Sequence, residues 1–263
     1  MVGTSFTGYV DVAQVTLYGF WAFFAGLILY LRREDKREGY PLVSEILGHT
    51  EEVVCEGLPP TPAPKLFRMF HGDLIEAPGS LFPPRLPNGA RPAATFPGAP
   101  LEPTGNPLVD GVGPASYAWR KDEPDLTIDG ALKIAPLRDA AEYRLDRRSP
   151  DPRGMAVIGA DGLVAGLCVD LWIDEVEESV RYLEVVLSLP AYEGQRVLLP
   201  QPFMRIRPRT RVIVVRSILA EQFAEVPRLR IPTQVTRFEE DKLVAYFGGG
   251  QLYATRARTG SAL

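Results

Sequence analysis

The stretch VAQVTLYGFWAFFAGLILYL, residues Val12–Leu31, has only Gln14 and Thr16 as polar members. A helix rises about 1.5 Å per residue, so twenty residues reach roughly 30 Å, the thickness of a bilayer hydrocarbon core. Inside that layer the backbone must satisfy its own hydrogen bonds, which a helix does. The stretch therefore predicts a single transmembrane helix over residues 12–31.

Charge is distributed unequally on the two sides of this helix. Residues 1–11 contain one acid, Asp11, and no base, whereas RREDKRE follows the apolar stretch directly. Basic residues collect on the cytoplasmic side of spanning helices. We therefore expect a periplasmic N-terminus at 1–11, a basic juxtamembrane collar at 32–43 and a cytoplasmic C-terminal domain. The expected membrane-interface residues are Arg32, Arg33, Lys36 and Arg37, with Tyr9, Tyr30 and Tyr40 as aromatic anchors.

A secretory signal and a buried helix fit the apolar stretch less well than a membrane anchor does. A secretory signal has its basic residues before the apolar core, whereas here they come after it. A buried helix of a soluble domain rarely has twenty nearly uninterrupted apolar residues. Small residues on the stretch either face a neighbouring membrane helix or reflect their general frequency in spanning helices; they are Gly19, Ala22, Ala25 and Gly26.

The composition of the whole chain excludes several classes of protein. The 263 residues are 46% hydrophobic and 24% charged, with a net charge of −4. These values exclude a wholly disordered or collagenous chain and argue against a nucleic-acid-binding protein, which would be basic. The two cysteines, Cys55 and Cys168, allow at most one disulfide, and the two histidines, His49 and His71, exclude a three-histidine metal centre.

A proline-rich region separates the anchor from the rest of the chain. Just over half of the 25 prolines lie between residues 59 and 107. Proline lacks a backbone N–H and fixes φ, so this region cannot form a central strand or a long helix. Aromatic and leucine side chains nevertheless recur in it. We expect residues 44–130 to be an extended surface segment that lies over another protein.

From about residue 131 the pattern is typical of a small β domain. Two apolar runs, Met155–Ile158 and Leu163–Ile173, flank the turn sequence GADG and predict a hairpin. Further predicted strands are Val180–Leu187, Arg196–Leu199 and Arg211–Val215. A short helix is expected at 218–224, between Ser217 as N-cap and Pro227. A second helix is expected to begin at a capping box of Thr236 and Glu239 and to stop at Gly248–Gly250.

No familiar catalytic motif is present, but acids cluster around one predicted strand end. The sequences GxSxG, HExxH, GxxxxGKS and GxGxxG after a strand are all missing. Strand alternation predicts that Asp170, Trp172 and Asp174 point away from the core. Glu177 and Arg181 follow closely, and an earlier patch contains Asp125 and Asp129. The residues alone leave two interpretations open: a solvated charged edge, or a cluster that passes protons.

Seven segments resemble the H subunit of the purple-bacterial photosynthetic reaction centre. They are LYLRREDKREGYPLV (29–43), PTGNPLVDGVGPASYA (103–118), DPRGM (151–155), DLWID (170–174), RYLEV (181–185), VPRL (226–229) and EEDKLVAYFGGGQLYAT (239–255). The resemblance implies a membrane helix and a mostly β cytoplasmic domain with a PRC-type β-barrel at 131–263 and short C-terminal helices.

The resemblance also implies a function and partners. The chain would be a non-catalytic subunit that caps the L and M subunits, stabilises the complex and conducts protons to the secondary quinone. It would bind no cofactor alone, because bacteriochlorophyll, bacteriopheophytin, quinones and non-haem iron are expected in L and M. Further expected partners are a cytochrome subunit, a light-harvesting antenna ring and membrane lipids, in a cytoplasmic or intracytoplasmic (chromatophore) membrane.

The same resemblance assigns roles to individual residues. It implies Glu177 as the main proton relay, Asp174 as its neighbour and Arg181 as an electrostatic regulator. Asp170, Glu239 and Glu240 are further candidates. Members of the family have histidines as a proton entrance near residues 126–134, where this chain has none, so Asp125 or Asp129 is expected to collect protons instead.

Two functions outside this resemblance remain as alternatives. The first is a membrane-tethered PRC-barrel adaptor or scaffold with no role in electron transfer, which would purify without pigment. The second is a tethered enzyme, which the absence of a nucleophile–base pair makes the weakest of the three hypotheses.

Overall fold

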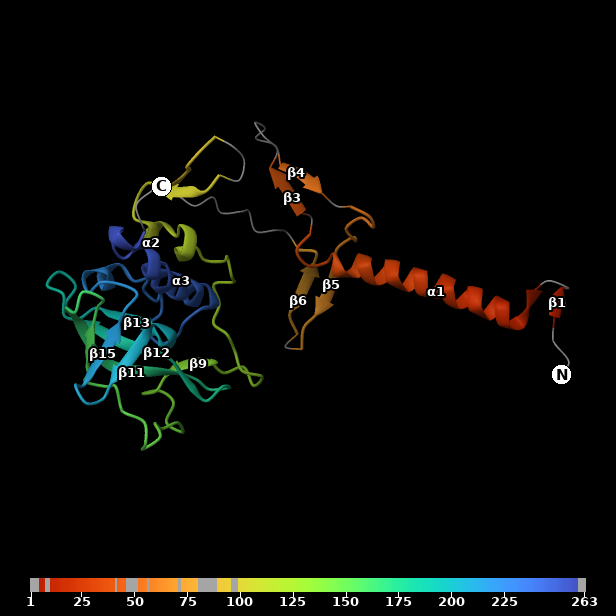
Figure 1. Ribbon diagram of the computed structural model, residues 1–263. Coiled ribbons are helices and arrows are strands. Elements are labelled where there is room, and N and C mark those ends of the chain that lie inside the picture. Colours follow the sequence, from red (N-terminus) through yellow and green to blue (C-terminus); the bar gives the residue numbers. More distant parts are fainter. Residues whose placement is uncertain are drawn as a thin grey trace. The chain divides into compact units, whose positions relative to one another are not determined.

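The computed structural model describes residues 5–7, 10–40, 42–45, 52–55, 57–70, 72–79, 89–95 and 99–259. The chain divides into two compact units, one of residues 1–84 with 96–98 and one of 85–95 with 99–263. Tyr9, expected as an interface anchor, and both histidines lie outside the described residues. Each unit is described below by itself (Figure 1).

The first unit consists of one long helix and short antiparallel strand pairs. The pairs are β1–β2, β3–β4 and β5–β6. The bounds are β1 Ser5–Thr7, β2 Val10–Asp11, α1 Val12–Asp35, β3 Leu42–Glu45, β4 Glu52–Cys55, β5 Lys65–Arg68 and β6 Leu74–Ala77. Strands in the proline-rich region thus form two-stranded pairs, in which every strand is an edge strand and proline is tolerated.

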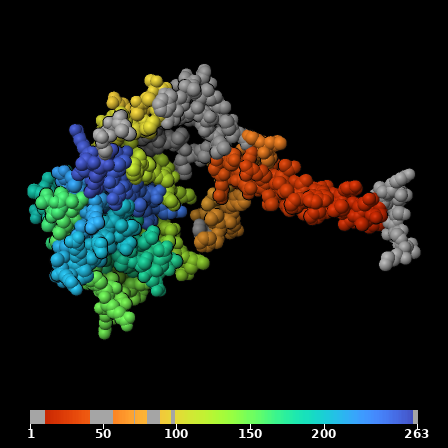
Figure 2. Space-filling model, in the orientation of Figure 1, coloured from red at the N-terminus to blue at the C-terminus, as the bar shows by residue number. Residues whose placement is uncertain are grey.

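The helix α1 begins at Val12, as the sequence predicts, and continues beyond the predicted end at Leu31 to Asp35. Asp11 is its N-cap and forms a capping box with Gln14, and Arg32 and Arg33 lie in its last turn. None of its residues is buried, although the helix is strongly apolar. Figure 2 shows one face of this helix, coloured red to orange. Among the described helices, α1 is the one that is long and apolar enough to span a bilayer, which supports a single-pass membrane protein.

The second unit contains the main sheet and the C-terminal helix. Its strands are β7 Ala90–Pro92, β8 Leu101–Pro103, β9 Ile134–Pro136, β10 Ala156–Ile158, β11 Val164–Asp174, β12 Ser179–Leu187, β13 Arg196–Pro200, β14 Met204–Arg207 and β15 Val212–Val215. Its helices are α2 Pro107–Asp110, η1 Gly113–Ala115, η2 Gln201–Phe203, η3 Glu221–Glu225, α3 Arg237–Tyr253 and η4 Arg256–Arg258. The mostly β domain with few helices is confirmed, while the PRC-type barrel stays a prediction.

Seven strands form the main sheet, in the order β13–β12–β11–β10–β15–β14, with β9 pairing with β11. The GADG hairpin is confirmed, because β10 and β11 pair antiparallel around it. The sequence analysis did not predict β9 or β14. Both are short, and β14 alternates arginine with apolar residues, a weaker signal than the continuous apolar runs that marked the other strands.

The hydrophobic core contains side chains from both the main sheet and α3. Its largest fully buried side chains are aromatic: Trp172, Phe223, Tyr246 and Phe247. The rings of Phe223 and Phe247 meet edge to face, with centroids 5.9 Å apart. The capping box of Thr236 and Glu239 starts α3 as predicted.

The predicted end of α3 at Gly248–Gly250 is wrong, because the helix continues to Tyr253. These glycines permit close packing instead of ending the helix. A Cβ on Gly249 would lie 2.5 Å from Cβ of Ala115, and one on Gly250 would lie 2.5 Å from the carbonyl oxygen of Ser217. The segments α2 and η1 use that close approach to pack against α3.

The helix expected at 218–224 is also wrong in type. A 3₁₀-helix, η3, covers Glu221–Glu225, and its N-cap is Ala220 without a side-chain hydrogen bond, in place of Ser217. The segment is too short for the hydrogen bonds of an α-helix to offset the cost of starting the helix. Burial of Phe223 and Ala224 stabilises the 3₁₀ turn instead.

Substitution of single glycines in α3 tests whether close packing requires them. Gly249→Ala should destabilise the protein by about 1–3 kcal/mol, because overpacking exceeds the helix-propensity gain of about 1 kcal/mol. Gly248→Ala is the matched control, since the nearest atom to its added Cβ is 3.7 Å away, and it should leave stability unchanged or raise it. Urea unfolding of the full chain in detergent measures both. Equal effects of the two substitutions would contradict this role of Gly249.

Candidate functional site

The carboxylate of Asp174 lies at the end of β11, where that strand pairs with two neighbours. Asp174 is directly opposite Ser179 of β12 and Ile134 of β9. Its Oδ1 accepts hydrogen bonds of 3.0 Å from the backbone N–H groups of Val176 and Glu177, which fixes the turn into β12. The side chain of Asp174 has no exposed surface. Two backbone donors therefore hold a fully buried carboxylate.

The prediction that Asp170, Trp172 and Asp174 point away from the core is wrong for Trp172, which is part of the core, and all three residues are buried. Asp170 is 6% exposed, and Trp172 and Asp174 are 0% exposed. Strand alternation alone does not decide burial here, because this half of the sheet is covered on both faces. The register between β11 and β12 also shifts twice, between Cys168 and Asp170 and between Trp172 and Ile173.

The second register shift places Arg181 beside Asp174. Trp172 pairs with Tyr182 and Ile173 with Val180, so Arg181 is the extra residue of a β-bulge. Bulges redirect side chains at functional positions. Arg181 Nε lies 4.0 Å from Asp174 Oδ2, and its Nη1 lies 3.7 Å from Glu177 Oε2. The predicted trio of Asp174, Glu177 and Arg181 is thus brought together.

Lys133 joins this trio to the acidic loop before β9. Its Nζ lies 3.5 Å from Asp174 Oδ2 and 3.8 Å from Asp125 Oδ2. The pairing of β9 with β11 sets this position, since Ile134 lies opposite Asp174 and Lys133 precedes it. Asp174 Oδ2 has no hydrogen-bond partner among the described residues. Lys133 and Arg181 therefore provide the positive charge that balances the carboxylate of Asp174.

Glu240, in the first turn of α3, lies at an adjoining cavity of about 280 Å³. It accepts a hydrogen bond of 2.8 Å from the hydroxyl of Tyr182. The cavity is lined by Asp125, Lys133, Arg181, Tyr182 and Glu240, with Arg120, Ile134, Arg237, Asp241 and Val244 completing its wall. A polar cavity of this size has room for several ordered waters.

Burial controls the protonation of both members of the Tyr182–Glu240 pair. Burial raises the pKa of the Glu240 carboxyl above its usual value, although the hydrogen bond from Tyr182 and the charge of Arg181 oppose the shift. Burial and the charge of Glu240 raise the pKa of Tyr182 well above its usual value, so the phenol remains a donor. Glu240 can therefore hold a proton at a higher pH than an exposed glutamate.

The remaining acids of this region are more exposed. The side chain of Glu177 is 54% exposed and that of Asp125 is 42% exposed. Asp129 is exposed in the loop that the Leu126–Leu132 bridge closes. These positions suit groups that exchange protons with water.

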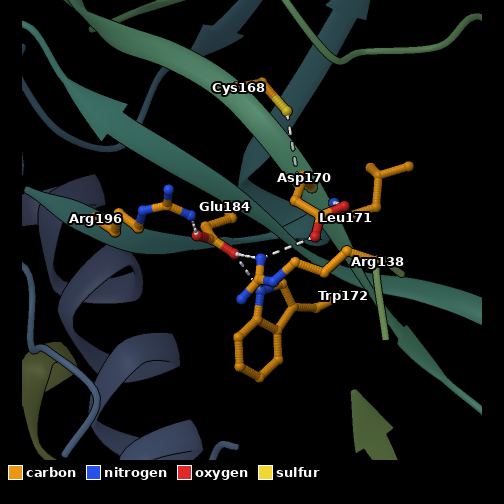
Figure 3. A network of polar contacts seen from close by, with 7 residues as sticks. All are labelled: Arg138, Cys168, Asp170, Leu171, Trp172, Glu184 and Arg196. Atoms are coloured by element: carbon orange, nitrogen blue, oxygen red, sulfur yellow. Dashed lines mark hydrogen bonds and ion pairs between the residues drawn. The ribbon is translucent and has the colours of Figure 1, made fainter. Parts of the chain in front are cut away.

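Asp170 belongs to a different cluster, shown in Figure 3. Arg138 Nη1 lies 2.9 Å from Asp170 Oδ2 and 2.5 Å from Glu184 Oε2, and Arg196 bonds the other oxygen of Glu184. Trp172 Nε1 donates to Glu184. Burial disfavours the charged form of Glu184, but these donors outweigh it and hold its pKa below the usual value. The cluster joins β11, β12 and β13 and has a structural role.

Glu239 and the basic collar also make contacts that stabilise the chain. Glu239 accepts from the backbone N–H groups of Thr236 and Arg230 at the N-terminus of α3. Lys36 is 2% exposed and donates to the carbonyl of Pro59. Arg37 pairs with Glu34 and donates to the carbonyls of Ala63 and Ala77. Arg32 and Arg33 are exposed, as is Tyr30, while Tyr40 lies beneath Lys36.

Lys133 and Tyr182 are site residues that the sequence analysis did not select. Tyr182 lies in the family-like segment RYLEV but was given no role there, and the pairing of β9 with β11 and the approach of α3 to β12 bring both residues to the site. Adjacency to Ile134 and to Arg181 was the available signal. In the described part of the chain, no group of three His, Cys, Asp or Glu side chains is arranged to hold a metal ion.

The raised pKa of Glu240 gives a pH dependence of stability. The native state binds more protons than the unfolded chain once pH exceeds the ordinary glutamate pKa of about 4.3, so Glu240 costs stability as pH rises. Glu240→Gln removes this cost and keeps an acceptor for Tyr182. Urea midpoints of the full chain should therefore rise relative to the native protein between about pH 4 and 8. A difference that stays constant with pH, as expected for the exposed control Glu193→Gln, would contradict this.

A comparison with protein families matches this chain to one of them. The family model described as photosynthetic reaction centre, H-chain N-terminal region, covers residues 4–139. The match includes α1 and extends through the loop that carries Asp125, Asp129 and Lys133 to β9. The chain therefore belongs to the H-chain family of the photosynthetic reaction centre, and it is a membrane-anchored reaction-centre subunit.

Proposed function

We propose that this chain caps the L and M subunits on the cytoplasmic side of the membrane and conducts protons toward their secondary quinone. Family membership supports the association with a reaction centre. The basic residues that follow the apolar stretch support a periplasmic N-terminus. The pigments, quinones and non-haem iron belong, in this proposal, to L and M.

A quinone site that is covered by protein needs a route by which protons can reach it. Reduction of a quinone to a quinol takes up two protons at a site covered by protein. A bare charge cannot cross a layer of low dielectric constant without a large cost. Carboxylates and ordered water, spaced within reach of each other, provide the route.

The observation that carries the proposal is a continuous series of charged groups around buried Asp174. The series runs from Asp125 through Lys133 to Asp174, then through Arg181 to Glu177, and no step exceeds 4.0 Å. Its members come from a loop, two strands and a turn. The polar cavity at Glu240 adjoins three of them.

Each group has a distinct role in this proposal. Asp129 and Asp125 collect protons from water, and Asp174 and Glu177 relay them. Lys133 and Arg181 balance the charge of Asp174. Glu240 with Tyr182 stores a proton beside the cavity. Asp170 and Glu239 have structural roles instead, because Arg138 pairs with Asp170 and backbone N–H groups bind both carboxylate oxygens of Glu239.

Neutral substitutions in the assembled reaction centre test the route. Asp174→Asn and Glu177→Gln should each slow the proton-coupled second electron transfer to the quinone by roughly tenfold or more, since a positioned proton donor contributes ~10²-fold and neighbouring acids remain. The amide oxygen introduced by Asp174→Asn can still accept from the backbone N–H groups of Val176 and Glu177. Flash-induced absorbance changes measure the rate, and the first electron transfer should be unchanged.

Glu193→Gln, in an exposed turn, is the matched control and should leave both rates unchanged. Equal rates in the Asp174 and Glu177 variants and the native complex, at several pH values, would remove these residues from the route. Loss of pigment from the purified complex would instead indicate a role in assembly.

A further inference from the structure

One row of directly paired residues crosses six strands of the main sheet, from β13 to β14. In order they are Arg196, Val186, Leu167, Ala156, Val212 and Arg207. Directly paired residues point to the same face of a sheet. With strands about 4.8 Å apart, the row is roughly 24 Å long. It is aliphatic over its four central strands and has an arginine at each end.

A second, shorter row lies beside the first on the same face. It consists of Val164, Ile158, Val214 and Arg205. Arg205 and Arg207 are two residues apart on β14, so they share this face. The intervening residues, Val157 of β10 and Ile213 of β15, point the other way and are fully buried in the core. We call the two rows the outer sheet face.

The outer sheet face is open at its centre. Leu167 is 46% exposed and Val164 is 50% exposed, and Leu163 beside them is 63% exposed. Residues 156, 158, 186, 212 and 214 are partly exposed. A contiguous aliphatic surface of this kind on a folded domain marks an interaction site.

The edge of this surface at β14 is basic, whereas Arg196 at the other end pairs with Glu184. Residues 201–220 contain five arginines and no acid, although the whole chain has a net charge of −4. In the part of the chain that the structure describes, Arg205 and Arg207 form no ion pair. Since β14 is an edge strand, its arginines border the surface without compensation.

We propose that the outer sheet face docks a protein partner whose contact surface is aliphatic at its centre and carries Asp or Glu at its border. Such a partner covers the valine and leucine rows and pairs its carboxylates with Arg205 and Arg207. A membrane surface fits less well, because the face has no Trp, Tyr or Phe, the residues typical of bilayer interfaces. A second copy of this chain fits less well, because its Arg205 and Arg207 would lie against arginines of the first copy and repel them.

Site-specific photo-cross-linking in the native membrane complex tests this. A benzoylphenylalanine in place of Leu167 in the full chain should form a covalent product with a different polypeptide. The attachment site should lie in an aliphatic segment beside Asp or Glu. Adding Arg205→Glu with Arg207→Glu should lower the yield by roughly tenfold or more, because the introduced carboxylates would face the carboxylates of the partner.

Two controls separate docking from general effects. Arg144→Glu, an exposed arginine in a loop outside the face, should leave the yield unchanged, and the same photoprobe at exposed Val109 should not give the product. Circular dichroism verifies that the variants remain folded. Adducts with lipid alone, adducts with a second copy of this chain, no protein adduct, or a yield that resists charge reversal at Arg205 and Arg207 would each overturn the proposal.

Discussion

The local structure of the site depends on one constraint, the charge balance of a carboxylate that has no contact with water. An unpaired buried charge costs several kcal/mol, so Asp174 must be surrounded by donors and cations. Backbone N–H groups of the turn satisfy Oδ1, while Lys133 and Arg181 lie within 4.0 Å of Oδ2. The pairing of β9 and the bulge at Arg181 supply those two cations. The same arrangement brings Asp125 and Glu177 into the charged series.

The main sheet provides two different environments. Around Trp172 and Tyr182 both faces are covered, and burial there raises the pKa of Glu240 and surrounds Glu184 with two arginines. Around Leu167 and Val164 only one face is covered, and an aliphatic surface with an arginine border remains open. A single sheet can thus support the proposed proton route at one end and the proposed docking surface at the other.

The sequence predicted those features that depend on local pattern. The apolar stretch gave the start of α1, although the helix continues past Leu31 to Asp35, and GADG and the capping box gave the hairpin and the start of α3. Where a feature depends on tertiary contacts, the prediction from the sequence was wrong or no prediction was made. The burial of Asp174 and Trp172 follows from cover on both faces, and the continuation of α3 through Gly248–Gly250 follows from close packing on Ala115 and Ser217. Lys133 and Tyr182 enter the site only through strand pairing and the approach of α3. The arginines of the outer sheet face were visible in the sequence, but their register with the valine rows was not.

The central claim is that carboxyl groups of this chain take up protons when the quinone of the reaction centre is reduced. Light-induced infrared difference spectroscopy of the native complex measures this directly, through the C=O stretch of a protonated carboxyl group. The account predicts a band that appears on quinone reduction, shifts in D₂O, and is lost or reduced in the Glu240→Gln and Asp174→Asn complexes. A carboxyl band that is unchanged in both variants, with normal quinone reduction, would contradict it.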